Sequence, residues 1–444
     1  MADYEEKSFW LATAGPYEEN PPLDGDADVD VAVVGGGFCG ISTAYYLRRA
    51  DPSLRVAVLE DKVVGYGASG RNAGFAMTLM GFTLDVTAWR FGKAKAKQAY
   101  EFGHRAVDHI GQLVDSHGID CDYEKPGLLT VATNKAQAKR LQHEIKLAEK
   151  LGVQGLQWLD AAATRGEVDS PTYLGARWEE QCALINPAKF VRGMKGVAQE
   201  HGVQVYERTP VMEFRRGPAL RLETPRGTVK AGKVVFATNA FSAGFPQLSG
   251  KQFPVFTYIV LTEPLSESQL GAIGWRQRQG IEDARNMIHY YRLTADNRLL
   301  FGGSDALYYF GGPLDRDRSP RIFRRLERDL RRTFPSLKEA RIEYRWGGPV
   351  SVPLDFFPAI GYLSKDKRVA YSLGCVGHGV ALMNMAGQIM RDLVLERESE
   401  FTELFFVNRR LIPLPPEPLR FALGETLRRV FKAQDAWEAR SAGA

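Results

Sequence analysis

A glycine-rich turn between an apolar strand and a helix constrains this chain more than any other feature. Residues 31–40 read VAVVGGGFCG, and a second apolar run, LRVAVLE, ends at Glu60. Gly35 permits a tight turn, Gly37 lets the backbone approach a pyrophosphate, and Gly40 lets the helix pack closely on the strand. The helix start then presents free N–H groups to phosphates, and Glu60 can accept hydrogen bonds from an adenosine ribose. The pattern predicts a dinucleotide-binding βαβ unit.

Length and charge restrict the class of protein. The chain has 444 residues, of which 44% are apolar and 25% charged, so we expect two or three globular domains. A net charge of +5 is mild for this length and does not indicate a nucleic-acid partner. The most basic stretch, 321–338, carries apolar residues at four-residue spacing and is interpreted as an amphipathic surface helix.

The cysteines and the N-terminus bear on metals and compartment. Cys39, Cys121, Cys182 and Cys375 are scattered without a C-x-x-C pair, which argues against a zinc site and a disulfide framework and favours a reducing compartment. The first residues, MADYEEKSFW, lack the basic and apolar regions of a signal peptide, and no apolar run reaches about 18 residues. We predict a cytoplasmic protein with no metal ion, no membrane span and no nucleic-acid partner.

The order of periodic segments predicts an α/β fold whose nucleotide domain is interrupted in sequence. Helical patterns cover 85–118 and 134–151, and period-2 strand patterns begin near residue 202. The nucleotide domain is expected to combine 29–80, 187–245 and 350–400, and a substrate domain built on an antiparallel sheet to combine 81–186 and 246–349. Residues 1–28 are predicted to be an irregular leader, and 401–444 a tail with a surface helix from Leu419 to Ala433. The active site is expected where the two domains meet.

Several motifs together carry a resemblance to a known family. They are VAVVGGGFCGISTAYYL, GYGASGRNAG, VVFATNA, the loop ending PLDFFPAIG, and GCVGHGVALMNMAG. In this order, over roughly residues 28–400, they resemble the D-amino-acid oxidase/glycine oxidase superfamily of FAD-dependent oxidoreductases. The phrases GYGASGRN and HYYRLTADNRLLFGG resemble its gamma-glutamylputrescine oxidoreductase-like amine oxidases. The resemblance implies a Rossmann-like FAD-binding domain of the glutathione-reductase type.

The resemblance also implies where FAD binds. Glu60 would hold the adenosine, the glycine turn the pyrophosphate, and the backbone of Val211 would meet the adenine. The loop 65–74 would run beside the flavin ring, with 377–380 at its pyrimidine end. The residues implied in cofactor binding are Gly35, Gly37, Phe38, Cys39, Gly40, Glu60, Asp61, Gly67, Ala68, Ser69, Arg71, Asn72, Ala73, Gly74, Val211, Ala237, Gly377, His378, Gly379 and Val380. Neither Cys nor His stands at the family's covalent-attachment positions, so non-covalent FAD is expected.

The sequence departs from the family pattern at three places. The Arg that holds the substrate carboxylate in amino-acid oxidases is matched by Val350, and a Lys that follows the G-H-G turn in sarcosine oxidases is matched by Ala381. No Lys occurs between Leu299 and Arg321, where the family places an oxygen-activating Lys. These departures disfavour a simple α-amino acid as substrate and leave both oxygen and another electron acceptor open.

Oxidation of an amine by a flavin requires the protein to position the substrate and to exclude water from it, more than it requires acid–base groups. Aromatic side chains around the substrate serve both needs. Tyr258 and Tyr291 are predicted to line the substrate site. Strand alternation places Tyr290 and Tyr291 on opposite faces of the sheet, so only one of them can line the site, and the prediction is Tyr291. His378 is expected to orient the flavin site. Trp346 and Arg345 are expected beside the loop that covers the flavin, with Trp346 as a substrate contact. Arg292 or Arg345 could contact a remote anionic group of the substrate.

The predicted reaction is oxidation of the C–N bond of a small primary or secondary amine, gamma-glutamylputrescine-like, to an imine that water converts to an aldehyde. Two alternatives remain open at this point: an N-alkyl amino acid or aminophosphonate as substrate, and a flavoprotein acting on tRNA or another macromolecule. The protein is expected to be a monomer or homodimer.

Overall fold

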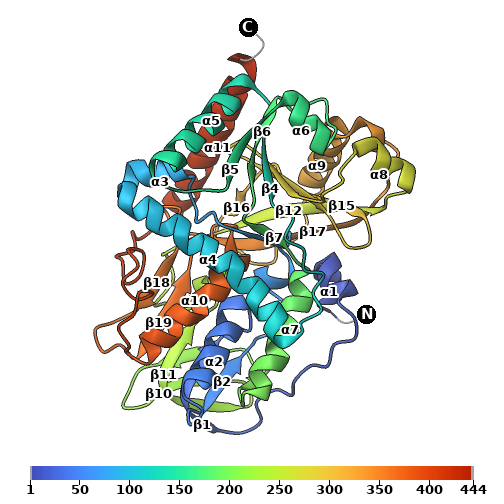
Figure 1. The fold of residues 1–444 in the computed structure, drawn as a ribbon. Helices are drawn as coiled ribbons and strands as arrows, with labels where there is room; N and C mark the ends of the chain where they lie inside the picture. The colour runs from blue at the N-terminus through green and yellow to red at the C-terminus, as the bar shows by residue number, and fades with distance from the viewer. Residues whose placement is uncertain (1–2, 442–444) are drawn as a thin grey trace.

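The chain contains two large sheets stacked along one long axis (Figure 1). A computed structural model describes residues 3–441. In the first sheet β1 pairs in parallel with β2 and β11, and β8 and β19 extend this parallel core. Its strands are β1 (Ala27–Val34), β2 (Val56–Leu59), β8 (Gln204–Tyr206), β9 (Glu213–Arg215), β10 (Leu220–Thr224), β11 (Gly227–Phe236), β18 (Ala359–Tyr362) and β19 (Val369–Leu373).

The parallel sheet is buried on both faces, as its near-continuous apolar strands require. Val31 and Val33 point toward a helical layer formed by α2 (Phe38–Ala50), α4 (Lys93–His117), α7 (Pro187–Glu200) and α10 (Gly379–Val394). Ala32 and Val34 point the other way, toward the β9–β11 strands. The predicted Rossmann-like unit is therefore present, with the glycine turn between β1 and α2.

The second sheet is mainly antiparallel, with one parallel pair between β4 and β13. Its strands are β4 (Leu128–Ala132), β5 (Leu156–Asp160), β6 (Gly175–Glu179), β12 (Phe253–Pro264), β13 (Gly280–Asp283), β14 (His289–Leu293), β15 (Arg298–Gly303), β16 (Leu307–Tyr308) and β17 (Ile342–Val352). A small sheet of β3 (Phe75–Met77) and β7 (Cys182–Leu184) lies between the two large ones.

The two faces of the second sheet have different neighbours. One face packs on α8 (Glu267–Ile273) and α9 (Pro320–Thr333), whose Ile322, Leu326 and Leu330 are buried as the four-residue spacing predicts. The opposite face, with Ile259 and Trp346, packs on β3 and on the N-terminal segment. We call this second surface the flavin-facing face, because it looks toward the loop 65–74.

Helices α5 (Lys135–Lys150) and α6 (Ala161–Glu167) pack on the second sheet, and α3 (Leu84–Phe91) packs on α4 and α5. The expected helical patterns at 85–118 and 134–151 are confirmed. Gly92, with a φ of 90°, separates α3 from α4. The tail helix α11 (Leu419–Ser441) is longer than the expected 419–433 and runs along the second sheet's end of the molecule (Figure 1).

The leader is not irregular throughout, which corrects the expectation for residues 1–28. Ser8 caps α1 (Phe9–Thr13) by accepting a hydrogen bond from the Leu11 N–H, and Phe9, Trp10 and Leu11 are buried. The Pro and acidic residues misled the interpretation, because three consecutive large apolar residues need burial whatever surrounds them.

We propose that each large sheet marks one of the two predicted domains, although β17 crosses the predicted boundary at residue 350. Among residues 3–441 no helix combines the length and the apolarity that crossing a bilayer would need.

Candidate functional site

A cavity of about 310 Å³ follows the carboxyl ends of β1 and β2 and continues toward α10. It lies where open parallel sheets expose ligand crevices. Most residues expected to bind FAD line it: Gly35, Gly37, Phe38, Cys39, Glu60, Asp61, Gly67, Ala68, Ser69, Asn72, Val211, Ala237, Gly377, Gly379 and Val380. We refer to it as the cofactor pocket.

The glycine turn leaves no space for side chains. Gly35 has a φ of 105°, and a Cβ there would lie 2.8 Å from the Ala237 carbonyl oxygen. A Cβ on Gly40 would lie 1.9 Å from the Gly35 carbonyl oxygen, so Gly40 permits close packing without lining the pocket. At Gly37 a Cβ would lie 2.9 Å from the Ser69 hydroxyl, and both residues line the pocket.

Glu60 closes the end of the pocket at which the resemblance implies the adenosine. Its carboxylate accepts the Gly36 N–H at 2.7 Å and the Lys62 N–H at 3.0 Å. Removal from water outweighs these two hydrogen bonds and raises the pKa of Glu60 to about 7. A carboxylate with spare lone pairs in this position fits a ribose diol.

The loop 65–74 is held by side chains from distant segments. The Trp10 indole N–H donates to the Asn72 carbonyl at 2.7 Å, and the Trp346 indole N–H donates to the Arg71 carbonyl at 2.8 Å. The Ser8 hydroxyl donates to the Gly70 carbonyl at 2.6 Å. Trp346 therefore supports the loop, whereas Ser8 and Trp10 were missed because no sequence spacing links them to it.

The other end of the pocket, where the resemblance implies the flavin ring, is lined by Val350, Cys375, Gly377 and Met383, and we call it the flavin end. Gly377 has a φ of 86°, and α10 begins two residues later. The start of α10 directs its unpaired N–H groups and the positive end of its dipole toward this side of the pocket.

His378 does not behave as the sequence suggested. Its imidazole does not line the cofactor pocket, and its Nδ1 is buried without a hydrogen-bond partner among residues 3–441. Burial lowers the pKa of His378 to about 4, so the ring is neutral near pH 7. The glycines on either side reach the pocket through their backbone, and the histidine side chain points elsewhere.

Three other members of the expected cofactor set support the loop from outside the pocket. The Arg71 side chain is buried, donates to the Tyr66 carbonyl at 2.8 Å and stacks on the Tyr66 ring. Gly74 has a φ of 79°, its N–H donates to the Asn72 side-chain oxygen, and the residue before it, Ala73, is buried.

The structure contradicts the choice of Tyr258 and Tyr291 as walls of the site. The Tyr258 hydroxyl hydrogen-bonds to the Tyr309 hydroxyl, and the Tyr258 ring packs against Phe323 of α9. Tyr291 stacks on Phe301 and pairs with the Tyr173 hydroxyl at 2.9 Å. Both rings belong to the core under α9, because the alternation along β12 and β14 places these two residues on the face opposite to the one predicted.

Tyr290 occupies the flavin-facing face instead. It packs edge-on against Phe75 of β3, and Gly302 of β15 leaves the space in which its ring lies. The alternation of β14 was recognised in the sequence, but its phase depends on which face meets the loop 65–74. No pattern within β14 reports that.

Neither Arg292 nor Arg345 lies in the pocket, which corrects both substrate assignments. Arg292 is fully buried, and its guanidinium donates to the carbonyls of Gly74, Ile185 and Leu293. Arg345 is at the surface, 2.8 Å from the Glu327 carboxylate. The first ties two segments together, and the second is an exposed ion pair.

The residues present fit FAD. The pocket has a carboxylate at one end, a glycine turn at a helix start in its middle, and a second helix start at the other end. Among residues 3–441 the only charged side chains that line it are Glu60 and Asp61. The pocket thus offers backbone N–H groups to the anionic parts of the cofactor and no cationic clamp beside the flavin end.

Comparison with known proteins agrees with this geometry. The family model "FAD dependent oxidoreductase" matches residues 30–393. The chain is 33% identical to gamma-glutamylputrescine oxidoreductase of Escherichia coli (strain K12) over 97% of this chain and 96% of that protein. It is 26% identical to glycine oxidase of Bacillus licheniformis over 86% and 97% of the two chains.

Solved structures show the same fold. The crystal structure of glycine oxidase from Geobacillus kaustophilus superposes with a TM-score of 0.75 at 22% identity, covering 87% of this chain and 100% of that one. The family model spans both large sheets and the whole of the cofactor pocket from Gly35 to Val380. The resemblance inferred from the motifs is confirmed: this chain belongs to the DAO family of FAD-dependent oxidoreductases.

Proposed function

We propose that the chain oxidises the C–N bond of an extended primary or secondary amine. The carbon next to nitrogen loses two electrons and two protons are released in total, giving an imine that water hydrolyses to an aldehyde and ammonia or a shorter amine. When bound, FAD supplies the two-electron acceptor. Oxygen or another acceptor would take up these electrons in turn.

One observation carries the choice of an amine over an α-amino acid. Val350 lines the flavin end of the pocket at the place where amino-acid oxidases of this family hold a carboxylate with Arg. No Lys, Arg or His among residues 3–441 lines this pocket, so a substrate carboxylate there would lose its hydration without compensation. This argues against the N-alkyl amino acid alternative.

The similarity to gamma-glutamylputrescine oxidoreductase supports the same class, because that name specifies an amine at the end of a four-carbon chain. A chain of this kind needs an elongated path along the protein.

The residues of this chain would act mainly by positioning. The α10 start, at Gly379, stabilises negative charge that develops on the cofactor, through its dipole and free N–H groups. Tyr290, Phe75 and Trp346 would keep water from the reacting carbon and favour the neutral amine by desolvation. Neutral His378, outside the pocket, is not required to move a proton.

The test is anaerobic mixing of the holoenzyme with primary amines, secondary amines, α-amino acids and N-methyl amino acids. We expect the visible flavin absorbance to bleach with amines whose α-carbon carries no carboxylate, and aldehyde to form in equal amount. Peroxide on readmission of air would identify oxygen as the acceptor. Bleaching by α-amino acids alone would overturn the proposal.

A further inference from the structure

The C-terminal helix α11 carries a large share of the exposed apolar surface. Among residues 3–440, eight large hydrophobic side chains are exposed, and three of them are on α11: Leu419, Val430 and Trp437. Two more lie beside the helix, because Phe310 packs on Phe421 and Ile412 belongs to the segment that leads into α11. Exposed apolar side chains that gather on one element mark an interaction surface, whereas scattered ones do not.

The solvent side of α11 presents one continuous stripe. Exposed residues follow one another at spacings of three or four, so they lie on the same side of the helix: Leu419, Ala422, Thr426, Val430, Ala433 and Trp437. Val430 is 55% exposed and Trp437 is 67% exposed. At 1.5 Å per residue the stripe is about 27 Å long. We call it the outer stripe; Thr426 is its only polar member.

Several charged side chains of α11 point inward instead, which reverses the usual polarity of a surface helix. Lys432 and Arg428 contact the buried Asp305 carboxylate at 2.7 and 3.1 Å. Glu438 is buried and pairs with Arg140 at 2.7 Å. These ion pairs fix the helix on the second sheet and leave the outer stripe in solvent.

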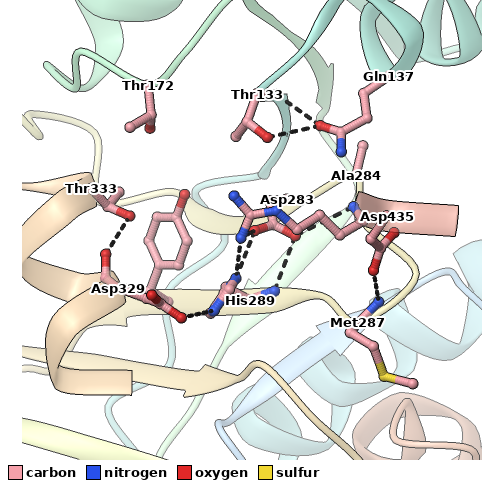
Figure 2. A network of polar contacts seen from close by, with 12 residues as sticks. Thr133, Gln137, Thr172, Asp283, Ala284, Met287, His289, Asp329, Thr333 and Asp435 are labelled. Atoms are coloured by element: carbon pink, nitrogen blue, oxygen red, sulfur yellow. Dashed lines mark hydrogen bonds and ion pairs between the residues drawn. The ribbon is translucent and has the colours of Figure 1, made fainter. Parts of the chain in front are cut away.

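Within residues 419–440 the exposed charged side chains are two arginines, Arg429 and Arg440. The Arg429 side chain is 79% exposed, although it lies 3.7 Å from the Glu425 carboxylate. The acidic residues of the helix are all half-buried or buried: Glu425, Asp435 and Glu438. Figure 2 shows Asp435 turned toward the body of the protein, where it accepts the Met287 N–H. The outer stripe is therefore bordered by positive charge and by no exposed carboxylate of this helix.

A second copy of the chain matches this surface poorly. Twofold pairing of two α11 helices over their full length brings the two Arg429 side chains to the same level, because residue 430 is the midpoint of Leu419–Ser441. In the antiparallel arrangement Arg440 also comes level with Arg420 of the other copy. Like charges would meet without an exposed acidic residue of α11 between them, which is unfavourable at an interface.

A membrane surface that contains anionic lipid matches both the apolar stripe and its charge. Apolar side chains of a helix that lies in the plane of the membrane enter the boundary between headgroups and acyl chains, and tryptophan is favoured at that depth. Arginine side chains extend from such a helix to the lipid phosphates. Each basic residue near an anionic surface strengthens binding about fivefold.

We propose that the outer stripe docks the protein on a membrane surface that contains anionic phospholipid. Val430 and Trp437 enter the headgroup boundary, and Arg429 and Arg440 contact the phosphates. The helix lies on the membrane without crossing it, because its inner side stays bound to the second sheet. The proposal concerns where the enzyme works and does not depend on which amine it oxidises.

The experiment measures flotation of the FAD-loaded full-length protein with vesicles of phosphatidylcholine alone or of phosphatidylcholine mixed with phosphatidylglycerol. We expect the protein to float with the mixed vesicles, and added salt to weaken this binding. Val430→Ser and Trp437→Ser should each weaken binding at least about tenfold, because an inserted apolar side chain is lost. Arg429→Gln should weaken it about fivefold.

Matched controls come from the first sheet, away from α11. Met212→Ser removes an apolar side chain that is 70% exposed, and Arg215→Gln removes an arginine whose side chain is 61% exposed. Both controls should bind the mixed vesicles as the wild type does. The substituted positions on α11 are exposed, so flavin content and the free energy of unfolding should stay at wild-type values in every variant.

Three results would overturn the proposal. The first is a wild-type protein that does not float with the mixed vesicles. The second is equal binding by the wild type and the Val430→Ser and Trp437→Ser variants. The third is a dimer, measured by sedimentation, that Val430→Ser dissociates while no form of the protein floats, which would assign the outer stripe to a second copy of the chain.

Discussion

In the cofactor pocket the contacts come mostly from backbone and small residues, whereas the flavin-facing sheet face is built from side chains of separate strands. Gly35, Gly37 and Gly40 lie within six residues of one another and act together. Glu282 and Tyr290 come from adjacent strands, and Trp346 from a strand far along the chain. A pocket made by one local turn is specified by a motif, while a surface made by strand pairing is specified only by the assembled sheet.

The substitution with the largest expected effect tests the cofactor pocket, whose contacts come mostly from the backbone. Gly37→Val places a side chain where the pyrophosphate must pass and should abolish FAD binding, leaving a folded colourless protein. Visible absorbance and circular dichroism of the purified variant check this. Gly196→Val is the control, since a Cβ there meets nothing within 4 Å, and it should remain yellow. A yellow Gly37→Val protein would refute the placement of the cofactor.

Trp10→Ala tests whether a distant segment supports the flavin loop. The indole is 2% exposed and donates to Asn72, so its loss should lower the free energy of unfolding by about 3–5 kcal/mol and weaken FAD binding. Chemical denaturation and flavin titration measure the two effects. Trp89→Ala, at an 85% exposed position, should change neither quantity. Equal effects of the two substitutions would mean that α1 does not hold the loop.

His289 makes the stability of the second sheet depend on pH. The Asp283 carboxylate raises the pKa of His289 above its ordinary 6.5, and the imidazolium holds the pKa of Asp283 below its ordinary 3.8. The histidine contribution is complete below pH 6.5 and is lost as pH rises through its raised pKa; the aspartate contribution is lost as pH falls through its lowered pKa. The pair therefore stabilises most between these limits.

His289→Gln should cost about 1.5–3 kcal/mol of unfolding free energy near pH 5.5, and less as the pH rises above the raised pKa of the histidine. Denaturation curves of both proteins across this range provide the check. A cost that grows with increasing pH would show that the histidine is buried in its neutral form, contrary to the geometry in Figure 2.

The smallest effect is expected at Arg345. Its ion pair with Glu327 is exposed, so Arg345→Ala should change the unfolding free energy by at most about 1 kcal/mol and leave the Kd of every amine unaltered. Anaerobic titration of the flavin absorbance with the best amine measures the second quantity. A raised Kd would restore this arginine as a substrate contact.

The sequence predicted the parts of the site that local chemistry determines. The glycine turn, Glu60 and the loop 65–74 line the pocket because each is a contiguous segment whose conformation follows from its own residues. The fold class followed from the order of the strands and helices and is confirmed by the family match. Val350, which matches the carboxylate-binding Arg of the family's amino-acid oxidases, lines the same pocket.

The side-chain-built face could not be predicted in the same way. Choosing Tyr291 over Tyr290 required knowledge of which sheet face meets β3, and both residues are aromatic and strand-forming. Ser8 and Trp10 were hidden by a leader whose Pro content suggested irregular structure.

A crystal structure of the FAD-bound protein with an unreactive amine analogue tests the central claim most directly. We expect the flavin ring at the Val350 end of the cofactor pocket and the nitrogen-bearing carbon of the analogue beside it. A flavin ring outside this pocket, or an analogue bound on the Tyr291 side of the sheet, would contradict the account.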